Sequence, residues 1–513
     1  MTRDSGQNRS IWMNVAVPEQ SPLTKDASAN VCIVGAGIAG MSTAYMLARE
    51  GRSVIVLDDG QIGGGMTERT TAHLASALDD RFYNLEDLHG PEGSRIAAES
   101  HSAAIDQIEQ IIAKENIDCD FERLNGYLFV PPGESTEILN REFEAATRAG
   151  VPVEIVDRAP IDSFDTGPCL RFANQAQFHP LKYLNGLADA IARNGGLIYT
   201  GTHVETVQSG TASHVKTRDK LTVMAKNIVI ATNTPVNDLV AIHTKQAPYM
   251  TYVIAAPVEK GTITRALFWD TLDPYHYVRL QSEKAESDTD LLIVGGEDHK
   301  TGQEHDADDR YRRLETWMRE RFPAVGTVEF QWSGQVMEPV DGLAFIGRNP
   351  MDTENIFVAT GDSGQGMTHG TIAGMLITDL IEGRGNRWAA LYDPSRKTLS
   401  AGLDFAKENL NVAAQYADWV TGGDVNSVED LAPGQGAVIR SGMTKIAAYR
   451  DDHNVLHERS ATCTHLGCVV AWNSDEKTWD CPCHGSRFDA LGHVISGPAV
   501  SDLKEVKKAH ASD

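Results

Sequence analysis

Residues 31–40 read Val-Cys-Ile-Val-Gly-Ala-Gly-Ile-Ala-Gly, and this stretch decides the fold of the larger part of the chain. An apolar, largely β-branched run enters a G-x-G-x-x-G turn, which predicts a buried strand followed by a helix. Gly35 permits the tight turn, Gly37 lets the backbone approach a pyrophosphate, and Gly40 lets the helix pack against the strand. The helix N-terminus then offers free N–H groups and a positive dipole end to the phosphates.

A second strand signal follows the predicted helix. Residues 54–57 read Val-Ile-Val-Leu and end in Asp58. That acid lies about 20 residues after the glycines, where a carboxylate accepts hydrogen bonds from the adenosine ribose. A glycine motif alone is weak evidence, but strand, helix, strand and acid in this order predict a dinucleotide site.

The distal sequence favours FAD over NAD as that dinucleotide. Residues 356–362 read as a buried strand that ends in Gly-Asp, and a glycine-rich turn then leads into the apolar helix 372–381. In this pattern, typical of FAD enzymes, Gly361 and Asp362 lie near the ribityl chain. The helix N-terminus after Gly366 would stabilise negative charge on the reduced flavin ring. The plainer alternative is a glycine-rich loop before a surface helix.

These features resemble the D-amino-acid oxidase or glycine oxidase superfamily, the DAO-type FAD oxidoreductases, over about residues 30–385. Residues 63–74 match the loop that lies along the isoalloxazine in that family, 204–205 match its adenine-side strand, and 228–233 match a short strand and turn that return to the cofactor. The resemblance implies bound FAD. Together with the glycine motif, it implies these contacts: Gly35, Gly37, Ile38, Ala39, Gly40, Asp58, Asp59, Gly65, Thr67, Thr70, Thr71, Ala72, His73, Val204, Ala231, Thr232, Gly361, Asp362, Gly366, Met367 and Thr368.

Two cysteine- and histidine-rich boxes lie near the C-terminus. Residues 463–468 read Cys-Thr-His-Leu-Gly-Cys, and residues 481–486 read Cys-Pro-Cys-His-Gly-Ser. Two cysteines and two histidines in two such loops indicate a [2Fe-2S] cluster in which one iron takes two thiolates and the other two imidazoles. A zinc site is the alternative, but C-x-H with C-x-x-H fits the usual zinc-finger spacings poorly. The pattern therefore indicates single-electron transfer.

This region, from residue 424 to the C-terminus, resembles the Rieske [2Fe-2S] domain family and most closely its cytochrome bc-type members. The resemblance implies Cys463, His465, Cys481 and His484 as cluster ligands. It also implies a disulfide between Cys468 and Cys483, with two free thiols as the alternative. Residues 497–499 resemble the proline loop that covers the cluster, although an ordinary turn would read the same way.

The last residue of the second box and a residue just after the box bear on the cluster potential. Ser486 stands where the family places a hydroxyl that hydrogen-bonds a cluster sulfur, and Phe488 stands where high-potential relatives have a tyrosine that donates a second such bond. A missing donor leaves the reduced, more negative cluster less stabilised. We therefore predict a lower potential than in respiratory Rieske proteins.

The whole chain resembles a bacterial family in which a DAO-type domain precedes a Rieske domain. We expect an α/β, Rossmann-like FAD domain of the DAO/glutathione-reductase type, an α+β substrate domain and an all-β Rieske domain. The expected boundaries are a flexible arm at 1–29, the FAD domain with its inserted antiparallel-sheet substrate domain at 30–385, a helical connector at 386–423 and the Rieske domain at 424–513. Substrate-domain strands are predicted at 126–130, 249–254, 276–280 and 291–296, and helices at 94–114 and 309–321.

Composition limits the partners of the protein. The chain has 513 residues and a net charge of −25, which argues against nucleic acid because phosphates would be repelled. We find neither a signal peptide nor a transmembrane run, so no membrane anchor is expected. Of seven cysteines, four lie in the two boxes, and this is not a disulfide framework. A cytoplasmic location is the expectation.

The sequence predicts an FAD-dependent dehydrogenase. A second complete dinucleotide fingerprint is lacking, which favours a small organic substrate over NADH as the electron donor. We expect hydride transfer to flavin from a C–H bond beside the nitrogen of an amine or amino-acid-like substrate. Single electrons would then pass to the cluster, whose histidine edges typically lie near solvent, and on to an external protein or quinone-like acceptor.

Candidate pocket residues lie on the predicted antiparallel strands. They are Tyr249, Tyr252, His276, Tyr277 and Arg279, with Trp332 opposite. Arg279 would suit a substrate carboxylate through a bidentate pair. Two alternatives stay open: a flavin oxidase or monooxygenase that uses O₂, and a non-enzymatic flavin and iron–sulfur electron-transfer protein.

Overall fold

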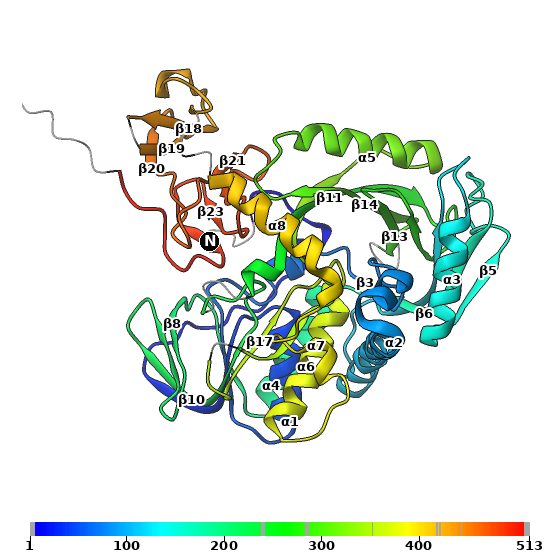
Figure 1. Ribbon diagram of the computed structural model, residues 1–513, viewed down its shortest axis with the longest axis horizontal. Helices are drawn as coiled ribbons and strands as arrows, with labels where there is room; N and C mark the ends of the chain where they lie inside the picture. Colours follow the sequence, from blue (N-terminus) through cyan, green and yellow to red (C-terminus); the bar gives the residue numbers. More distant parts are fainter. Residues whose placement is uncertain are drawn as a thin grey trace, which may run out of the picture.

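The computed structural model describes residues 6–237, 242–282, 287–350, 352–416, 419, 422–442 and 444–506. Two large sheets with their helices form the main body, and a smaller, all-β region lies at one end of it (Figure 1). Helix α8 (Gly402–Gln415) runs along the main body towards that region. The described chain thus contains a two-sheet unit and a separate β unit.

The first sheet is built around the strand that enters the glycine motif. Its spatial order is β16-β17-β10-β1-β2-β7, and a β8–β9 hairpin pairs with β10. The pairings β17–β10–β1–β2–β7 are parallel. The strands are β1 (Ala27–Val34), β2 (Val54–Leu57), β7 (Leu197–Tyr199), β8 (Val204–Gln208), β9 (His214–Thr217), β10 (Thr222–Ile230), β16 (Phe345–Arg348) and β17 (Ile356–Thr360).

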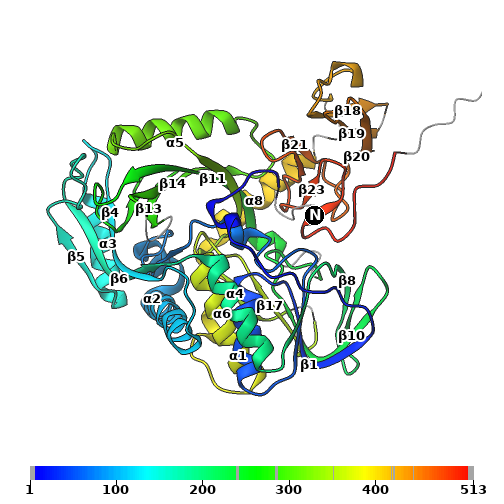
Figure 2. The same cartoon turned by 180° about the vertical axis from the view of Figure 1, so that it is seen from behind.

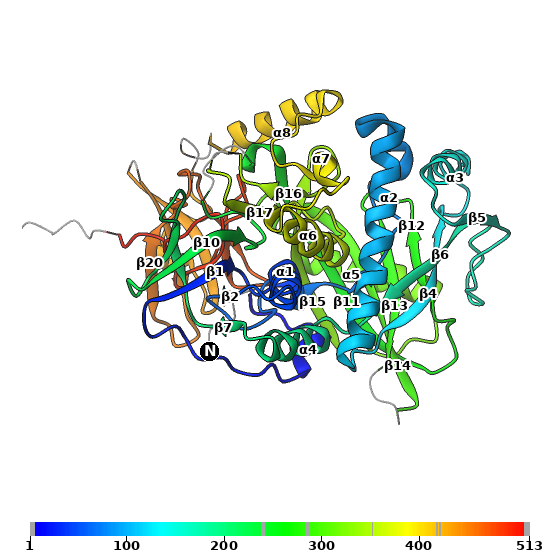
Figure 3. The same ribbon diagram turned by 90° about the horizontal axis from the view of Figure 1, so that it is seen from below.

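Helices α1 (Ile38–Arg49), α4 (Pro180–Arg193) and α6 (Gly366–Ile381) lie together beside this sheet (Figure 2). Since the parallel strands are buried on both faces, they read as continuous apolar runs. The long helix α2 (Phe82–Glu115) has a kink at Gly90, which precedes Pro91, and it runs alongside the second sheet (Figure 3).

The second sheet has the order β15-β11-β14-β13-β12-β4-β6-β3, with β5 beside β6, and all its pairings are antiparallel except β12 with β4. One face packs against α5 (Ala307–Arg321), while α3 (Glu137–Ala149) lies near β5 at the far edge. The strands are β3 (His73–Leu74), β4 (Glu122–Phe129), β5 (Val153–Val156), β6 (Cys169–Gln177), β11 (Gln246–Glu259), β12 (Leu267–Asp270), β13 (His276–Ser282), β14 (Thr289–Lys300) and β15 (Phe330–Pro339).

The C-terminal region consists of two small antiparallel sheets. The three-stranded sheet contains β18 (Gln435–Ser441), β19 (Thr444–Arg450) and β20 (Leu456–Ser460). The four-stranded sheet contains β21 (Ala471–Asn473), β22 (Thr478–Asp480), β23 (Arg487–Asp489) and β24 (Val494–Ser496). Both cysteine boxes lie in loops that flank β21 and β22, and their cysteines are part of one small core with Trp479 and Phe488.

The predicted fold class is confirmed, but the predicted N-terminal arm needs correction. The N–H of Gln7 donates to the carbonyl of Glu476 at 3.1 Å, which ties this segment to the C-terminal region. Trp12 is fully buried, and its Nε1 donates to the carbonyl of Thr70 at 2.6 Å. Residues 6–14 are therefore packed between the two units, because they carry buried apolar and hydrogen-bonding side chains.

The predicted connector contains α7 (Ala389–Tyr392) and α8, joined by turns. Among the described residues, no helix combines the length and the apolar composition that crossing a bilayer requires.

Candidate active site and iron–sulfur centre

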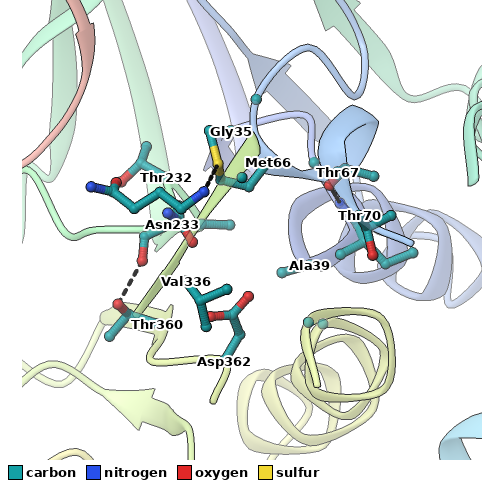
Figure 4. Close-up of a pocket in the computed structure, with 18 of the residues that line it drawn as sticks. Gly35, Ala39, Met66, Thr67, Thr70, Thr232, Asn233, Val336, Thr360 and Asp362 are labelled. Atoms are coloured by element: carbon teal, nitrogen blue, oxygen red, sulfur yellow. Dashed lines mark hydrogen bonds between the residues drawn. The ribbon is translucent and has the colours of Figure 1, made fainter. Parts of the chain in front are cut away.

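A cavity of about 290 Å³ lies where the two large sheets and the C-terminal region meet. Figure 4 shows residues from widely separated segments around it: Thr67 and Thr70 come from the loop before β3, while Thr360 and Asp362 lie at and after the end of β17. Most of the predicted FAD contacts line it: Gly35, Gly37, Ile38, Ala39, Asp58, Asp59, Gly65, Thr67, Thr70, Thr71, His73, Val204, Ala231, Thr232, Gly361, Asp362, Gly366 and Met367.

The glycines of the first turn fit a dinucleotide cradle. Gly35 has a φ of +108°, which disfavours any residue with a side chain. A Cβ on Gly37 would approach Thr67 Oγ1 to 3.1 Å at the cavity wall. A Cβ on Gly40 would clash with the carbonyl of Gly35, so this third glycine serves the packing of α1 on the turn.

The acid at the end of β2 holds the same turn. Asp58 accepts hydrogen bonds from the N–H of Ala36 at 2.5 Å and of Gly60 at 2.8 Å. Burial and the neighbouring charge of Asp59 raise the pKa of Asp58 to about 7, although these N–H donors oppose the shift. Asp58 also lines the cavity, where the predicted ribose contact would lie.

Three predicted FAD contacts, Gly40, Ala72 and Thr368, lie behind the cavity wall. Ala72 has a φ of +58° and donates its N–H to Thr70 Oγ1 at 3.0 Å, so it shapes the loop that carries Thr70 and Thr71. Thr368 Oγ1 donates to the carbonyl of Gln365 and lies 2.8 Å from His101 Nδ1. All three support cavity residues rather than line the cavity.

Of the predicted substrate-pocket residues, only Tyr277 lines the cavity. Its hydroxyl lies 2.6 Å from Thr251 Oγ1. Because successive side chains of a strand point to opposite faces, the neighbouring His276 faces α5, where its ring stacks on Trp317 at 4.5 Å. Tyr252 also faces α5 and contacts Tyr311. Tyr249 and Trp332 are likewise absent from the lining.

Arg279 does not take the position proposed for it. Its guanidinium is fully buried and donates to the carbonyls of Thr71, Ala72 and Phe178 at 2.9–3.2 Å. Burial lowers its pKa to about 9. The assignment of a substrate carboxylate to Arg279 is corrected: its Nη1 holds the loop that carries His73 through backbone carbonyls, and its Nη2 donates to Gln281 Oε1.

Several cavity residues were missed by the sequence analysis. Thr251, Trp269, Tyr275 and Asp298 come from strands β11 to β14 or their ends, and Asp79 follows β3. Strand alternation from Tyr277 could have indicated Tyr275, two residues away. Nothing local in the sequence indicates the others, because their approach depends on the register between strands.

The four predicted cluster ligands converge in the C-terminal region. Cys463 and Cys481 are buried within hydrogen-bonding reach of one another, and the rings of His465 and His484 lie 5.0 Å apart. Cys468 and Cys483 form the expected disulfide, with Cα atoms 6.4 Å apart. The Ser486 hydroxyl hydrogen-bonds Cys463 and accepts the N–H of Ala499 at 3.0 Å. This donor set suits a [2Fe-2S] cluster with mixed ligands.

The histidine edge of this centre faces the main body rather than open solvent. The ring of His243, from a short helix at residues 243–245, lies 5.0 Å from the His465 ring and 6.1 Å from the His484 ring. His484 is only 5 % exposed. The expectation of histidine edges near solvent is corrected for His484, because the main body covers that ligand.

The cavity and the iron–sulfur centre share a wall. Gln335, on β15, lines the cavity and donates its Nε2 to the carbonyl of Gly485 at 3.0 Å, inside the second cysteine box. Residues 494–497, 499 and 500 also line the cavity. A buried ion pair between Arg69 and Glu476, 2.5 Å apart, lies at the same junction.

Comparisons with known proteins agree with this geometry. The family model described as FAD dependent oxidoreductase matches residues 30–380, and the Rieske [2Fe-2S] domain model matches residues 422–507. The chain belongs to the FAD-dependent oxidoreductase family. The oxidoreductase carries a C-terminal Rieske domain, so its cofactors are FAD and a [2Fe-2S] cluster. The alternative of a zinc site at the two cysteine boxes is therefore rejected.

One relative matches almost the whole chain, and others match about 72% of it. The Rieske 2Fe-2S iron-sulfur protein YhfW of Bacillus subtilis is 31% identical over 495 residues, which is 96% of both chains. Gamma-glutamylputrescine oxidoreductase of Escherichia coli is 28% identical over 72% of this chain and 87% of its own. Glycine oxidase from Geobacillus kaustophilus has the same fold, with a TM-score of 0.61 over 72% of this chain and 99% of that one, at 18% identity.

Proposed function

We propose that this FAD-dependent oxidoreductase dehydrogenates a small amine or amino-acid-like substrate and delivers the electrons through its own Rieske cluster to an external acceptor. The observation that carries this proposal is the shared wall: Gln335 lines the cofactor cavity and is hydrogen-bonded to the loop that holds the cluster. When bound, FAD supplies two-electron acceptance from a C–H bond beside nitrogen, and the cluster supplies single-electron transfer.

The residues of the cavity suit this chemistry. An amine must carry a neutral nitrogen next to the reacting carbon to lose hydride, and the aromatic side chains around Tyr277 form one wall of the cavity in which that carbon would lie. His73 lines the same wall, and burial with the charge of Arg279 lowers its pKa to about 3, so its ring is neutral at physiological pH. At the other end of the cavity, burial raises the pKa of Asp362 to about 6.

The relatives support an amine or amino-acid substrate class. The Escherichia coli relative is named for a substituted putrescine, and the structural relative is named for glycine. Both names refer to compounds that contain an amine nitrogen, which is consistent with the substrate class proposed here.

The order of electron transfer is tested by anaerobic reduction. The purified holoprotein is mixed with a panel of amines and amino acids and followed by absorbance and electron paramagnetic resonance. The expected result is bleaching of the flavin, followed by the signal of a reduced, histidine-ligated cluster. A panel that leaves the flavin oxidised would contradict the proposal, and rapid peroxide formation in air by a cluster-free variant would favour an oxidase instead.

The shared wall is tested with Gln335→Leu. Loss of the hydrogen bond to Gly485 should slow reduction of the cluster more than reduction of the flavin, because it loosens the contact between the two sites. Gln331→Leu is the matched control, since Gln331 is an exposed glutamine on the same strand. Equal rates of cluster reduction in the two variants would show that Gln335 does not contribute to electron transfer from the flavin to the cluster.

A further inference from the structure

The side of the cavity formed by the second sheet is an aromatic box. The ring of His73 lies 5.8 Å from the ring of Tyr277 and 6.1 Å from that of Trp269. The ring of Tyr275 lies 5.5 Å from that of Tyr277. All four side chains line the same cavity. Aromatic faces grouped in this way attract an organic cation that has shed its water.

Two carboxylates complete this box. Asp79 lines the cavity and accepts a hydrogen bond from the Tyr275 hydroxyl at 2.9 Å. Asp298 lines it too; the Thr251 side chain hydrogen-bonds its carboxylate, and its buried Oδ1 has no hydrogen-bond partner among the described residues. A buried carboxylate is costly, and a ligand cation beside it would lower that cost.

Within the part of the chain that the structure describes, the aromatic side of the cavity offers no free cationic side chain for an anion. Among the described residues that line it, Arg69 is the only arginine or lysine. Its guanidinium is already bound to Glu476 and to the carbonyls of Ser333 and Asn8. Arg279 does not line the cavity; its Nη1 donates to backbone carbonyls and its Nη2 to Gln281 Oε1. A substrate carboxylate in the box would therefore face Asp79 and Asp298 without a countercharge.

We propose that the substrate of this oxidoreductase is an alkylamine that carries a second, positively charged amino group and no carboxylate, with the charged group held in the box by Asp79 and Asp298. This inference rests on the proposed function and names its substrate class. The two amino groups have different roles: the charged one anchors the substrate, and the neutral one lies on the carbon that is oxidised.

The electrostatics of the box agree with this role. Burial raises the pKa of Asp298 to about 7, and burial also raises the pKa of Asp79. Burial outweighs the charge of Arg81 near Asp79 and that of Arg310 near Asp298. A cation in the box would add positive charge and favour ionisation of both groups.

The proposed preference is tested by ligand binding to the FAD-loaded holoprotein under anaerobic conditions. The probes are 1,4-diaminobutane, butyltrimethylammonium, glycine and pentanoate, and the readouts are the shift in melting temperature and the perturbation of flavin absorbance. Butyltrimethylammonium has no C–H beside a nitrogen lone pair, so its binding is measured without turnover. We expect both cations to bind at least about tenfold more tightly than glycine or pentanoate.

Variants connect that preference to the two carboxylates. Asp298→Asn and Asp79→Asn keep the size of the side chain, remove its charge and should each weaken cation binding by about tenfold. Asp189→Asn is the control, because it makes the same change in charge at an exposed position on α4.

The outcomes separate this inference from the proposed function. Binding of glycine or pentanoate as tight as that of the cations would overturn the inference, as would cation affinity unchanged in both variants. Flavin reduction by α-amino acids but not by the diamine would overturn it and leave the proposed function standing. Carboxylate-dependent cation binding without flavin reduction by any amine would support the box and overturn the proposed reaction.

Discussion

At the scale of single residues, the iron–sulfur centre shows how few side chains set its chemistry. Two thiolates and two imidazoles define the cluster type, and hydroxyl groups nearby adjust its potential. Ser486 supplies one such hydroxyl, within hydrogen-bonding reach of Cys463. Phe488 is fully buried in the same small core as the box cysteines and offers no donor.

Phe488→Tyr should raise the cluster potential. One added hydrogen bond of about 1 kcal/mol to the reduced cluster corresponds to a rise of roughly 40 mV for a one-electron couple. A redox titration followed by electron paramagnetic resonance measures the shift, and Phe405→Tyr, an exposed position on α8, is the control. An unchanged or lower potential would show that the position at residue 488 does not reach the cluster sulfur.

At the scale of elements, the cofactor cradle depends on two helices that approach closely. Glycines on α6 face α1: a Cβ on Gly374 would lie 2.9 Å from the Cβ of Ser42, and a Cβ on Gly370 would lie 3.1 Å from the backbone nitrogen of Ala39. In the predicted site α1 carries the phosphate end of the cradle and α6 the flavin end, so this close packing would set the distance between them.

Gly374→Val should force α1 and α6 apart. Overpacking of this kind costs about 1–3 kcal/mol, and FAD should bind more weakly because both ends of its site move. Thermal unfolding and the FAD content of purified protein measure the two effects. Gly385→Ala is the matched control, because an added Cβ there meets nothing within 4 Å. If the Gly374→Val variant is as stable as the wild type and contains as much FAD, the proposed role of the helix contact is contradicted.

At the scale of the whole molecule, the Rieske domain is docked on the oxidoreductase by buried polar contacts. The Arg69–Glu476 pair has no exposed side-chain surface, and Glu476 also accepts hydrogen bonds from Ser333 Oγ at 2.6 Å and from the N–H of Asn8 at 3.1 Å. The junction thus joins the loop before β3, β15, the N-terminal segment and the Rieske domain. A fixed junction keeps the wall between cavity and cluster closed.

Glu476→Gln should destabilise this junction, because it leaves the buried Arg69 charge uncompensated. Breaking such a pair costs about 3 kcal/mol or more. Thermal unfolding measures the loss, with Glu92→Gln as the control, since Glu92 pairs with Arg95 at an exposed position. Equal melting temperatures for the two variants would show that the junction does not depend on this pair.

The same pair predicts a dependence of stability on pH. Burial alone would raise the pKa of Glu476, but Arg69 and Arg487 outweigh it and hold the pKa below its usual value of 4.5. Its stabilisation is therefore fully present above pH 4.5 and is lost as the pH falls through the lower folded value. The difference in melting temperature between wild type and Glu476→Gln should be constant from about pH 7 to about pH 5 and shrink below about pH 4.5. A constant difference at still lower pH would exclude ionised Glu476 as its source.

The sequence by itself determined the two cofactor types, because each is held by contiguous motifs whose geometry depends on neighbouring residues: the turn at Gly35 to Gly40 and the boxes at 463–468 and 481–486. Only the tertiary structure decided which side chains of the second sheet line the cavity. Neighbouring side chains on a strand point to opposite faces of the sheet. The sequence therefore does not show which of His276 and Tyr277 faces the cavity, and the register of the strand in the fold does. The docking of Glu476 on Arg69 joins residues about 400 positions apart, and no local pattern encodes such a contact.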